Sequence, residues 1–400
     1  MEQTATESRQ GGLSVLAYPF RAFFLLTALY AVVIVVGWVA YLTLGLPIPL
    51  DIPPLYWHGH EMLMGIVPAA IAGFLLTAMT NWTGAPPLRG GGLLGLIVLW
   101  LAGRVAMWIP GLLPYPVVAA ADLLFMPVLA AYVFRVLQRY GNRRNFLIAG
   151  VLATLTVANA LMHLGIMRLQ LAWFGLGEYL ALDLIAVLIV IIAGRITPAF
   201  TANWLRMRGG DPARVRQPPW LEWAALAATA AMIPADLVGP GSRWAGAVAL
   251  LAGLANALRL AGWSGHRTLR EPLLWILHLG YLWLVLALVL KGLSPWLYLS
   301  RSLWIHAMGT GSIATLILGV MTRVSLGHTG RTMQLPAGAV VIYWLITAAA
   351  VLRVSLAGGL IGSHGTVLAL VGIFWTLAFG LFFAYYFPIL TQSRADGRPG

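Results

Sequence analysis

The sequence has 400 residues, of which 60% are hydrophobic and only 9% are charged. A soluble globular domain carries roughly 25% charged residues, so this composition excludes a soluble chain and indicates an all-α polytopic membrane protein. No cysteine is present, which excludes disulfides, thiolate metal sites, iron–sulfur clusters and covalently attached haem. We therefore expect His, Met or carboxylate side chains to hold any metal.

Apolar runs long enough to cross the roughly 30 Å hydrocarbon core predict twelve transmembrane helices. We expect a cytoplasmic segment at 1–20, a single membrane domain at 21–390 and a cytoplasmic tail at 391–400. In chain order the predicted helices cover residues 22–46, 59–80, 92–113, 115–137, 145–167, 176–198, 219–238, 243–262, 272–291, 301–321, 336–357 and 364–388.

The net charge of +13 comes from 25 Lys and Arg against 12 Asp and Glu. Membrane proteins concentrate cationic residues in their cytoplasmic loops. With the N-terminus inside, 18 cationic residues fall in inner segments and only four in outer ones, which are Arg168, Arg243, Lys291 and Arg301. This bias predicts cytoplasmic N- and C-termini, and it explains most of the charge without a nucleic-acid partner.

A weak internal repeat links the second and tenth predicted helices. The pattern His60-Glu61-Met62-x-x-Gly65 is echoed by His306-Ala307-Met308-x-x-Gly311. The end of the sixth helix (194–204) is loosely similar to residues 73–82 of the second. If the second, sixth and tenth helices are related, the bundle consists of three repeats of four helices.

The histidines are the first candidates for chemistry, because ionisable side chains are costly inside a membrane. His58 and His60 begin the second helix on its outer side, beside Tyr56 and Trp57. Neutral imidazole suits haem iron and copper, and a thioether such as that of Met62 suits Cu(I) and low-spin haem. His58 and His60 face different sides of a straight helix, so they serve two centres or the helix starts between them. The alternative is that both are ordinary interfacial histidines.

Three further histidines are candidate ligands. His306 precedes a run of small residues that lets a flat macrocycle, or simply a neighbouring helix, approach closely. His163 shares a helix face with Asn159, and its alternative role is an interhelical hydrogen bond. His278 lies deeper in the ninth helix, where a core histidine with satisfied hydrogen bonds is the alternative.

Charged residues within the predicted helices form a second candidate group. Arg104 could pair with haem propionates, since guanidinium binds carboxylate in a bidentate manner. Glu61 could orient a ligand histidine or accept a proton. Glu178 and Asp183 could relay protons or neutralise an arginine such as Arg104.

Taken together, several motifs in chain order resemble the NnrS family over essentially the whole sequence. They are Pro19-Phe20-Arg21-x-Phe23-Phe24-Leu25, Trp57-His58-x-His60-Glu61-Met62, Gly73-Phe74-Leu75-Leu76-Thr77-Ala78, Asn81-Trp82-Thr83-Gly84, Gly194-Arg195-x-x-Pro198-x-Phe200-Thr201, His306-Ala307, and Thr322-Arg323-x-Ser325-Leu326-Gly327-His328-Thr329-Gly330-Arg331.

The resemblance implies a multi-pass protein of the bacterial inner membrane that contains non-covalent b-type haem and copper. It also implies an association with nitric oxide, in denitrification or nitrosative stress. We expect His58, His60 and His306 as preferred ligands, with Met62, His163 and His278 in reserve. Arg104 would then balance propionate charge, and any reduction of nitric oxide would require an electron donor.

Three other interpretations arise from the sequence, and the last two of them remain open. Twelve helices with histidines on the second and tenth are similar to the catalytic subunits of haem–copper oxidases and nitric oxide reductases. However, the sixth and seventh helices lack histidine, so the three-His copper site of those enzymes is not reproduced. A secondary transporter could use Glu61, Arg104, Asp122, Glu178 and Asp183 along its path. A haem-based sensor without turnover is the third.

Overall fold

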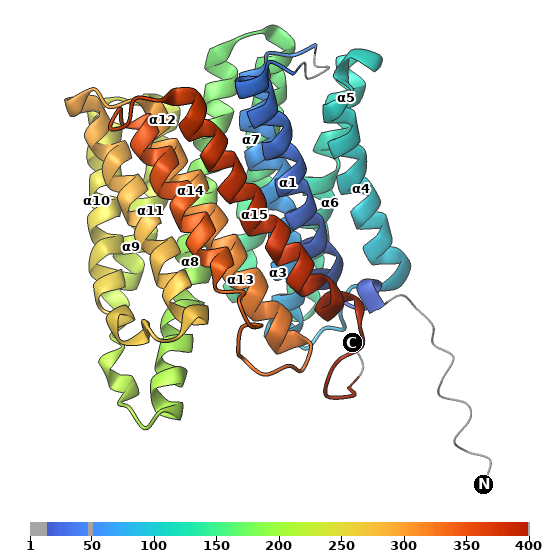
Figure 1. The fold of residues 1–400 in the computed structure, drawn as a ribbon, viewed down its shortest axis with the longest axis vertical. Helices are drawn as coiled ribbons and strands as arrows, with labels where there is room; N and C mark the ends of the chain where they lie inside the picture. The colour runs from blue at the N-terminus through green and yellow to red at the C-terminus, as the bar shows by residue number, and fades with distance from the viewer. Residues whose placement is uncertain (1–13, 47–50, 399–400) are drawn as a thin grey trace.

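The computed structural model describes residues 14–46 and 51–398 of the chain. Every regular element within these ranges is helical, and the helices pack side by side into one bundle (Figure 1). Eleven helical stretches are long and apolar enough to cross a membrane, and the 17-residue helix α14 supplies the twelfth span. The prediction of an all-α, twelve-helix membrane bundle is confirmed.

Nine spans are single helices and three are composite. The single helices are α1 (Pro19–Leu44), α4 (Gly90–Trp108), α7 (Phe146–Arg168), α8 (Leu171–Met207), α9 (Pro219–Val238), α10 (Arg243–Ala261), α11 (Pro272–Leu297), α14 (Val341–Ala357) and α15 (His364–Thr391). Span 2 consists of α2 (Pro54–His60), η2 (Glu61–Ile66) and α3 (Val67–Thr83); span 4 of α5 (Tyr115–Leu123) and α6 (Phe125–Arg139); and span 10 of α12 (Arg301–His306), η7 (Ala307–Ile313) and α13 (Ala314–His328).

Span 2 begins earlier than the sequence predicted. The helix starts at Pro54, where proline is favoured at the first helical position because it has no N–H to lose. His58 and His60 therefore both lie inside the helix. The segment that follows, η2, is a π-helix, and span 10 has a π-helix, η7, at the matching place directly after His306.

Span 6 is longer than predicted at both ends. Helix α8 has 37 residues and continues through Pro198, where the sequence predicted its end. Proline cannot donate a hydrogen bond to the carbonyl four residues earlier, and that carbonyl, of Gly194, instead accepts from the Gln217 side chain at 3.4 Å. At 1.5 Å per residue the helix is about 55 Å long, so its end projects beyond the neighbouring helices (Figure 1).

The contacts between spans repeat with a step of four. Helix α1 contacts α15, α3 and α13; α7 contacts α6, α8 and α2; and α11 contacts α10, α13 and α8. Spans 1, 5 and 9 thus each contact three kinds of neighbour: the preceding span, the following span and the span three positions earlier. The order of spans is circular here, so span 12 precedes span 1. This pattern supports the hypothesis of three repeats of four helices.

Spans 2, 6 and 10 meet around an apolar cavity of about 110 Å³. Its walls are almost entirely aliphatic, with Val67 and Ile71 from α3, Ile185 and Leu188 from α8, and Leu316 from α13. The three spans that the sequence linked by weak similarity are therefore also linked by a common apolar centre.

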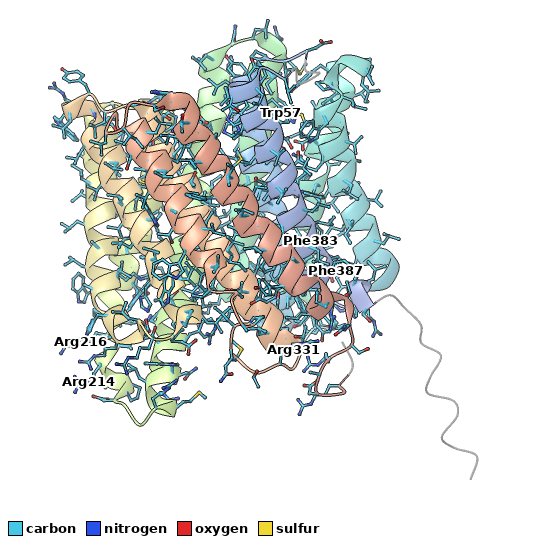
Figure 2. The ribbon with its side chains drawn as sticks, viewed as in Figure 1. Trp57, Arg214, Arg216, Arg331, Phe383 and Phe387 are labelled. Carbon is cyan, nitrogen blue, oxygen red and sulfur yellow. The ribbon has the colours of Figure 1, made fainter. Side chains whose placement is uncertain are left out.

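The two faces of the bundle differ in charge. Helix α1 begins and α15 ends at the same face (Figure 1). Arg214, Arg216 and Arg331 lie at that face, whereas Trp57 lies near the opposite one (Figure 2). We call the arginine-rich face the inner face and the other the outer face, because cytoplasmic loops are enriched in arginine.

Two candidate metal centres near the outer face

The two histidines of span 2 serve different sites. His58 and Met62 line a cavity on one side of the span, whereas His60 and Glu61 belong to a fully buried group of polar side chains on another. π-Helical segments such as η2 occur frequently at functional sites. Of the two arrangements left open by the sequence, a helix start between the two histidines is excluded because the helix begins at Pro54.

The first site is a cavity of about 240 Å³ between spans 2, 6 and 10, which we call the outer cavity. Its lining combines side chains with nitrogen, oxygen or sulfur atoms and aromatic side chains. These residues include His58, Met62, Tyr56, Phe174, Glu178, Arg301, Ser302 and His306.

His306 and His58 reach the outer cavity from two different spans. Nδ1 of His306 lies 2.7 Å from the carbonyl oxygen of Ser302, so this nitrogen carries the proton and Nε2 keeps a free lone pair. His58 stacks on Trp38 with ring centroids 4.3 Å apart, and its buried Nδ1 has no hydrogen-bond partner. Two imidazoles on one cavity, each with a nitrogen that makes no protein hydrogen bond, form a donor set suitable for a metal.

Glycines lie along both histidine-bearing walls of the outer cavity. A methyl group added at Gly309 would meet no atom within 4 Å. At Gly59 it would lie 3.3 Å from Phe174 and from Oε1 of Glu178, so the residue there must be small. Of the small residues after His306, Gly309 borders the cavity, whereas Gly311 packs closely against Trp283 of α11.

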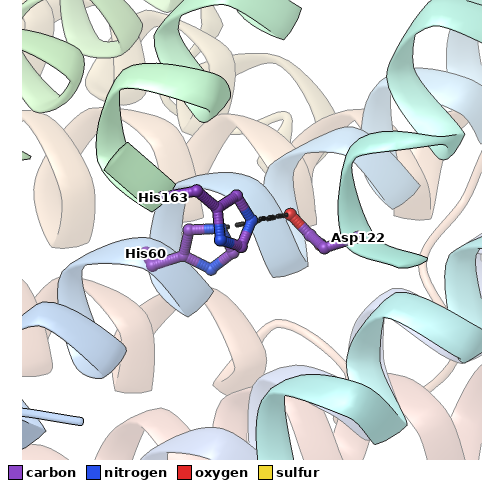
Figure 3. A group of neighbouring side chains, drawn as sticks. All are labelled: His60, Asp122 and His163. Carbon is purple, nitrogen blue, oxygen red and sulfur yellow. Dashed lines mark hydrogen bonds and ion pairs between the residues drawn. The ribbon is translucent and has the colours of Figure 1, made fainter. Parts of the chain in front are cut away.

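The second site is the polar cluster, which we define as His60, Glu61, Arg104, Asp122 and His163. Each of these residues is less than 5% exposed. Potential ligand atoms of His60, Asp122 and His163 all lie within 4.8 Å of one another (Figure 3). Nε2 of His163 is 2.9 Å from Asp122 Oδ2, and Nε2 of His60 is 3.2 Å from the same oxygen. Three side chains from spans 2, 4 and 5 thus converge on one point.

The outer nitrogens of these two histidines are held by hydrogen bonds. Nδ1 of His60 lies 2.7 Å from Glu61 Oε1 and must donate to it, and Nδ1 of His163 lies 2.9 Å from the Tyr115 hydroxyl. Nε2 of His60 then faces two acceptors, Asp122 Oδ2 and Asn159 Oδ1. Lone pairs on these three atoms would repel one another, and either a second proton on the imidazole or a bound cation removes that repulsion.

Arg104 connects the two carboxylates of the polar cluster. It contacts Glu61 Oε2 at 2.5 Å and also pairs with Asp122 Oδ1. Tyr30 donates to the same Glu61 oxygen. With neutral histidines, two carboxylates and one guanidinium give the cluster a charge of −1, so it has room for one positive charge. The sequence predicted that Arg104 pairs with haem propionates. Arg104 belongs to the polar cluster instead and does not line the outer cavity.

His278 joins neither site. It lies near the inner end of α11, where Thr201 contacts its Nε2 at 2.9 Å and Trp263 packs against its ring. The sequence analysis did not nominate Tyr115, and it named Asp122 only for a transporter path and not as a metal ligand. The signal that could have identified Asp122 is a lone carboxylate within an apolar span, together with the shared helix face of His163 and Asn159.

The family comparison agrees with this architecture and with the histidine motifs. The family model described as "NnrS protein" matches residues 14–394. The chain belongs to the NnrS family. Membership indicates a nitric-oxide-linked membrane protein, and NnrS proteins are associated with metals. No curated protein matches the sequence in a separate search.

Proposed function

We propose that this NnrS protein is a haem–copper protein of the bacterial inner membrane that binds or processes nitric oxide near the outer face. The observation that carries the proposal is the pair His58 and His306, which reach one cavity from spans 2 and 10. Denitrification or defence against nitrosative stress is the corresponding physiological setting.

The outer cavity is the proposed haem site. It offers two imidazoles, the thioether of Met62 and glycine-bordered walls, and these donors suit b-type haem iron. Arg301 lines the same cavity and Arg353 contacts Ser302 at 3.4 Å. In the proposal these arginines, rather than Arg104, would pair with propionates. Haem would supply an iron position at which nitric oxide binds.

The polar cluster is the proposed copper site. His60 and His163 would contribute Nε2 and Asp122 would contribute Oδ2, a donor set compatible with copper. Glu61 and Tyr115 would hold the far ring nitrogens and so fix each imidazole in its ligating orientation. The −1 charge of the polar cluster favours a cation, and Cu(I) would neutralise it. Copper would supply one-electron exchange beside the haem site.

The centre of the bundle provides a route for the substrate. Nitric oxide is small and uncharged, so it enters apolar surroundings easily. The aliphatic cavity among spans 2, 6 and 10 lies within the same three spans that enclose the outer cavity. The aliphatic side chains that line this cavity would admit the gas while excluding water. Turnover would additionally need an external electron donor.

Metal analysis and visible spectroscopy of the detergent-purified protein test the assignments. We expect haem bands in a reduced-minus-oxidised spectrum, with stoichiometric iron and copper. His58→Ala and His306→Ala should each remove or shift the haem bands. His163→Ala and Asp122→Asn should lower copper content while the haem bands persist. His364→Ala, at an exposed position at the start of α15, is the matched control and should leave both metals in place.

Two outcomes would contradict the proposal. A colourless protein from cells well supplied with haem would overturn the metal assignments and favour a transporter. Unchanged spectra in both His58→Ala and His306→Ala would remove the outer cavity as the haem site. Nitric oxide binding by the haem without consumption, in the presence of a reductant, would identify a sensor rather than an enzyme.

A further inference from the structure

A second polar cavity opens near the outer face, away from His58 and His306. It has a volume of about 630 Å³, and we call it the vestibule. Ionisable residues from five elements line it: Tyr179 of α8, Asp236 of α9, Arg243 of α10, Lys291 of α11 and Arg301 of α12. Lys291 is the only lysine in the sequence.

Lys291 lies between two aspartates, and we call Asp183, Asp236 and Lys291 the triad. The ammonium group pairs with Asp183 and lies 2.6 Å from Asp236 Oδ2. All three residues are at most 6% exposed. The rings of Tyr179 and Trp304 flank the ammonium at 5.5 and 5.1 Å from their centroids. The triad is therefore a largely buried group of two carboxylates and one ammonium, at the wall of the vestibule.

The charges around the triad do not balance it. Arg301 is paired with Glu178, and Arg243 is an exposed residue at the beginning of α10. With both carboxyl groups ionised, the triad has a charge of −1 inside the membrane, which is costly. Moreover, Asp236 Oδ1 is buried and has no hydrogen-bond partner, although its residue lines the vestibule. An ionised oxygen without a partner needs a proton or a cation.

We propose that the triad is a proton-binding site that is filled from the outer face through the vestibule. A hydronium ion in the vestibule transfers its proton to a carboxylate of the triad, which leaves water and a neutral carboxyl group. The remaining carboxylate and Lys291 then form a neutral pair. Proton binding thus removes the excess charge of the triad.

The triad is placed to supply protons to the outer cavity. Arg301 lines both the vestibule and the outer cavity, and its partner Glu178 lines the outer cavity. A proton that leaves the triad would cross beside Arg301 to the Glu178 carboxylate. This delivery step rests on the proposed function, because nitric oxide reduction consumes protons, whereas proton binding by the triad does not depend on it.

Infrared difference spectroscopy of the holoprotein in vesicles with known orientation tests the binding site. The probe is the pH of the outer or inner solution, each held by an impermeant buffer. We expect a carboxylic-acid C=O band that follows the outer pH and is lost in both Asp183→Asn and Asp236→Asn. Each variant keeps one aspartate with Lys291, so the bundle remains charge-balanced. Asp211→Asn, in an exposed loop, is the control and should retain the band.

The outcomes separate this inference from the haem–copper proposal. A band that follows the inner pH would overturn the proton site. The site would also be overturned if neither Asn substitution removed a band. The sidedness measurement uses the wild-type chain, so it remains decisive if a variant fails to fold. A protein that lacks haem but shows the band would refute only the proposed function.

The delivery step has its own test. Glu178→Gln should retain the triad band but slow proton uptake on reduction of the metals by at least about tenfold, in line with the loss of a positioned proton carrier. Unchanged uptake would overturn delivery through Glu178.

Discussion

Two histidines separated by one residue lie in two different surroundings, His58 at the outer cavity and His60 in the polar cluster. Helical geometry alone predicts that His58 and His60 face different directions. The partners of each could not be predicted in this way, because Asp122 and His163 approach His60 from other spans. Sequence periodicity describes which face of one helix a residue occupies, whereas the neighbour across that face depends on how spans pack.

Arg104 is predicted to be the residue on which the polar cluster depends for stability. Arg104→Leu would leave Glu61 and Asp122 buried without their common cation, which typically costs about 3–5 kcal/mol. We expect a large fall in the thermal unfolding temperature of the detergent-solubilised protein. The double variant Arg104→Leu/Glu61→Gln should recover part of that loss, since it removes one of the two unpaired charges. Equal instability of the single and double variants would show that the ion pairs are not the cause.

At the scale of elements, hydropathy predicts the twelve spans but not their interruptions. The two π-helical segments follow His60 and His306 directly, and hydropathy does not signal them because it is averaged over a whole span. The length of α8 escaped prediction for a different reason. A proline such as Pro198 normally ends a helix. Here the side chain of Gln217, 19 residues after Pro198, donates a hydrogen bond to the Gly194 carbonyl that the proline leaves without a partner.

Gly65 in η2 is predicted to be essential for the close packing of the polar cluster. A methyl group there would lie 2.8 Å from the Tyr30 ring and 2.9 Å from Arg104 Nη1 and Glu61 Oε2. Gly65→Ala should therefore destabilise the protein by about 1–3 kcal/mol, the usual cost of overpacking, and lower its copper content. The measurement is thermal unfolding with metal analysis.

Gly95→Ala is the matched control for this substitution. Gly95 is an exposed helical glycine of α4 with open space around it, so alanine should be neutral or slightly stabilising there. If Gly65→Ala behaved like Gly95→Ala, the close approach at η2 would not constrain the cluster.

At the scale of the whole molecule, the two buried charge clusters occupy corresponding sets of spans. The polar cluster is built from spans 2 to 5, and the triad with its vestibule from spans 6 to 9 and the start of span 10. The contacts between spans repeat with the same step of four. The weak similarity among spans 2, 6 and 10 predicted a step of four spans, but the two charge clusters differ in composition and could not be matched by sequence.

The absence of cysteine allows a clean test of the orientation in the membrane. Gly362, between α14 and α15, and Thr332, between α13 and α14, are exposed loop positions on opposite faces. If the arginine-rich face is cytoplasmic, a membrane-impermeant maleimide should label Gly362→Cys in intact cells and Thr332→Cys only after permeabilisation. The unmodified chain should not react under either condition. The reverse labelling pattern would place the histidine sites and the vestibule on the cytoplasmic side, and protons would then reach the triad from the cytoplasm.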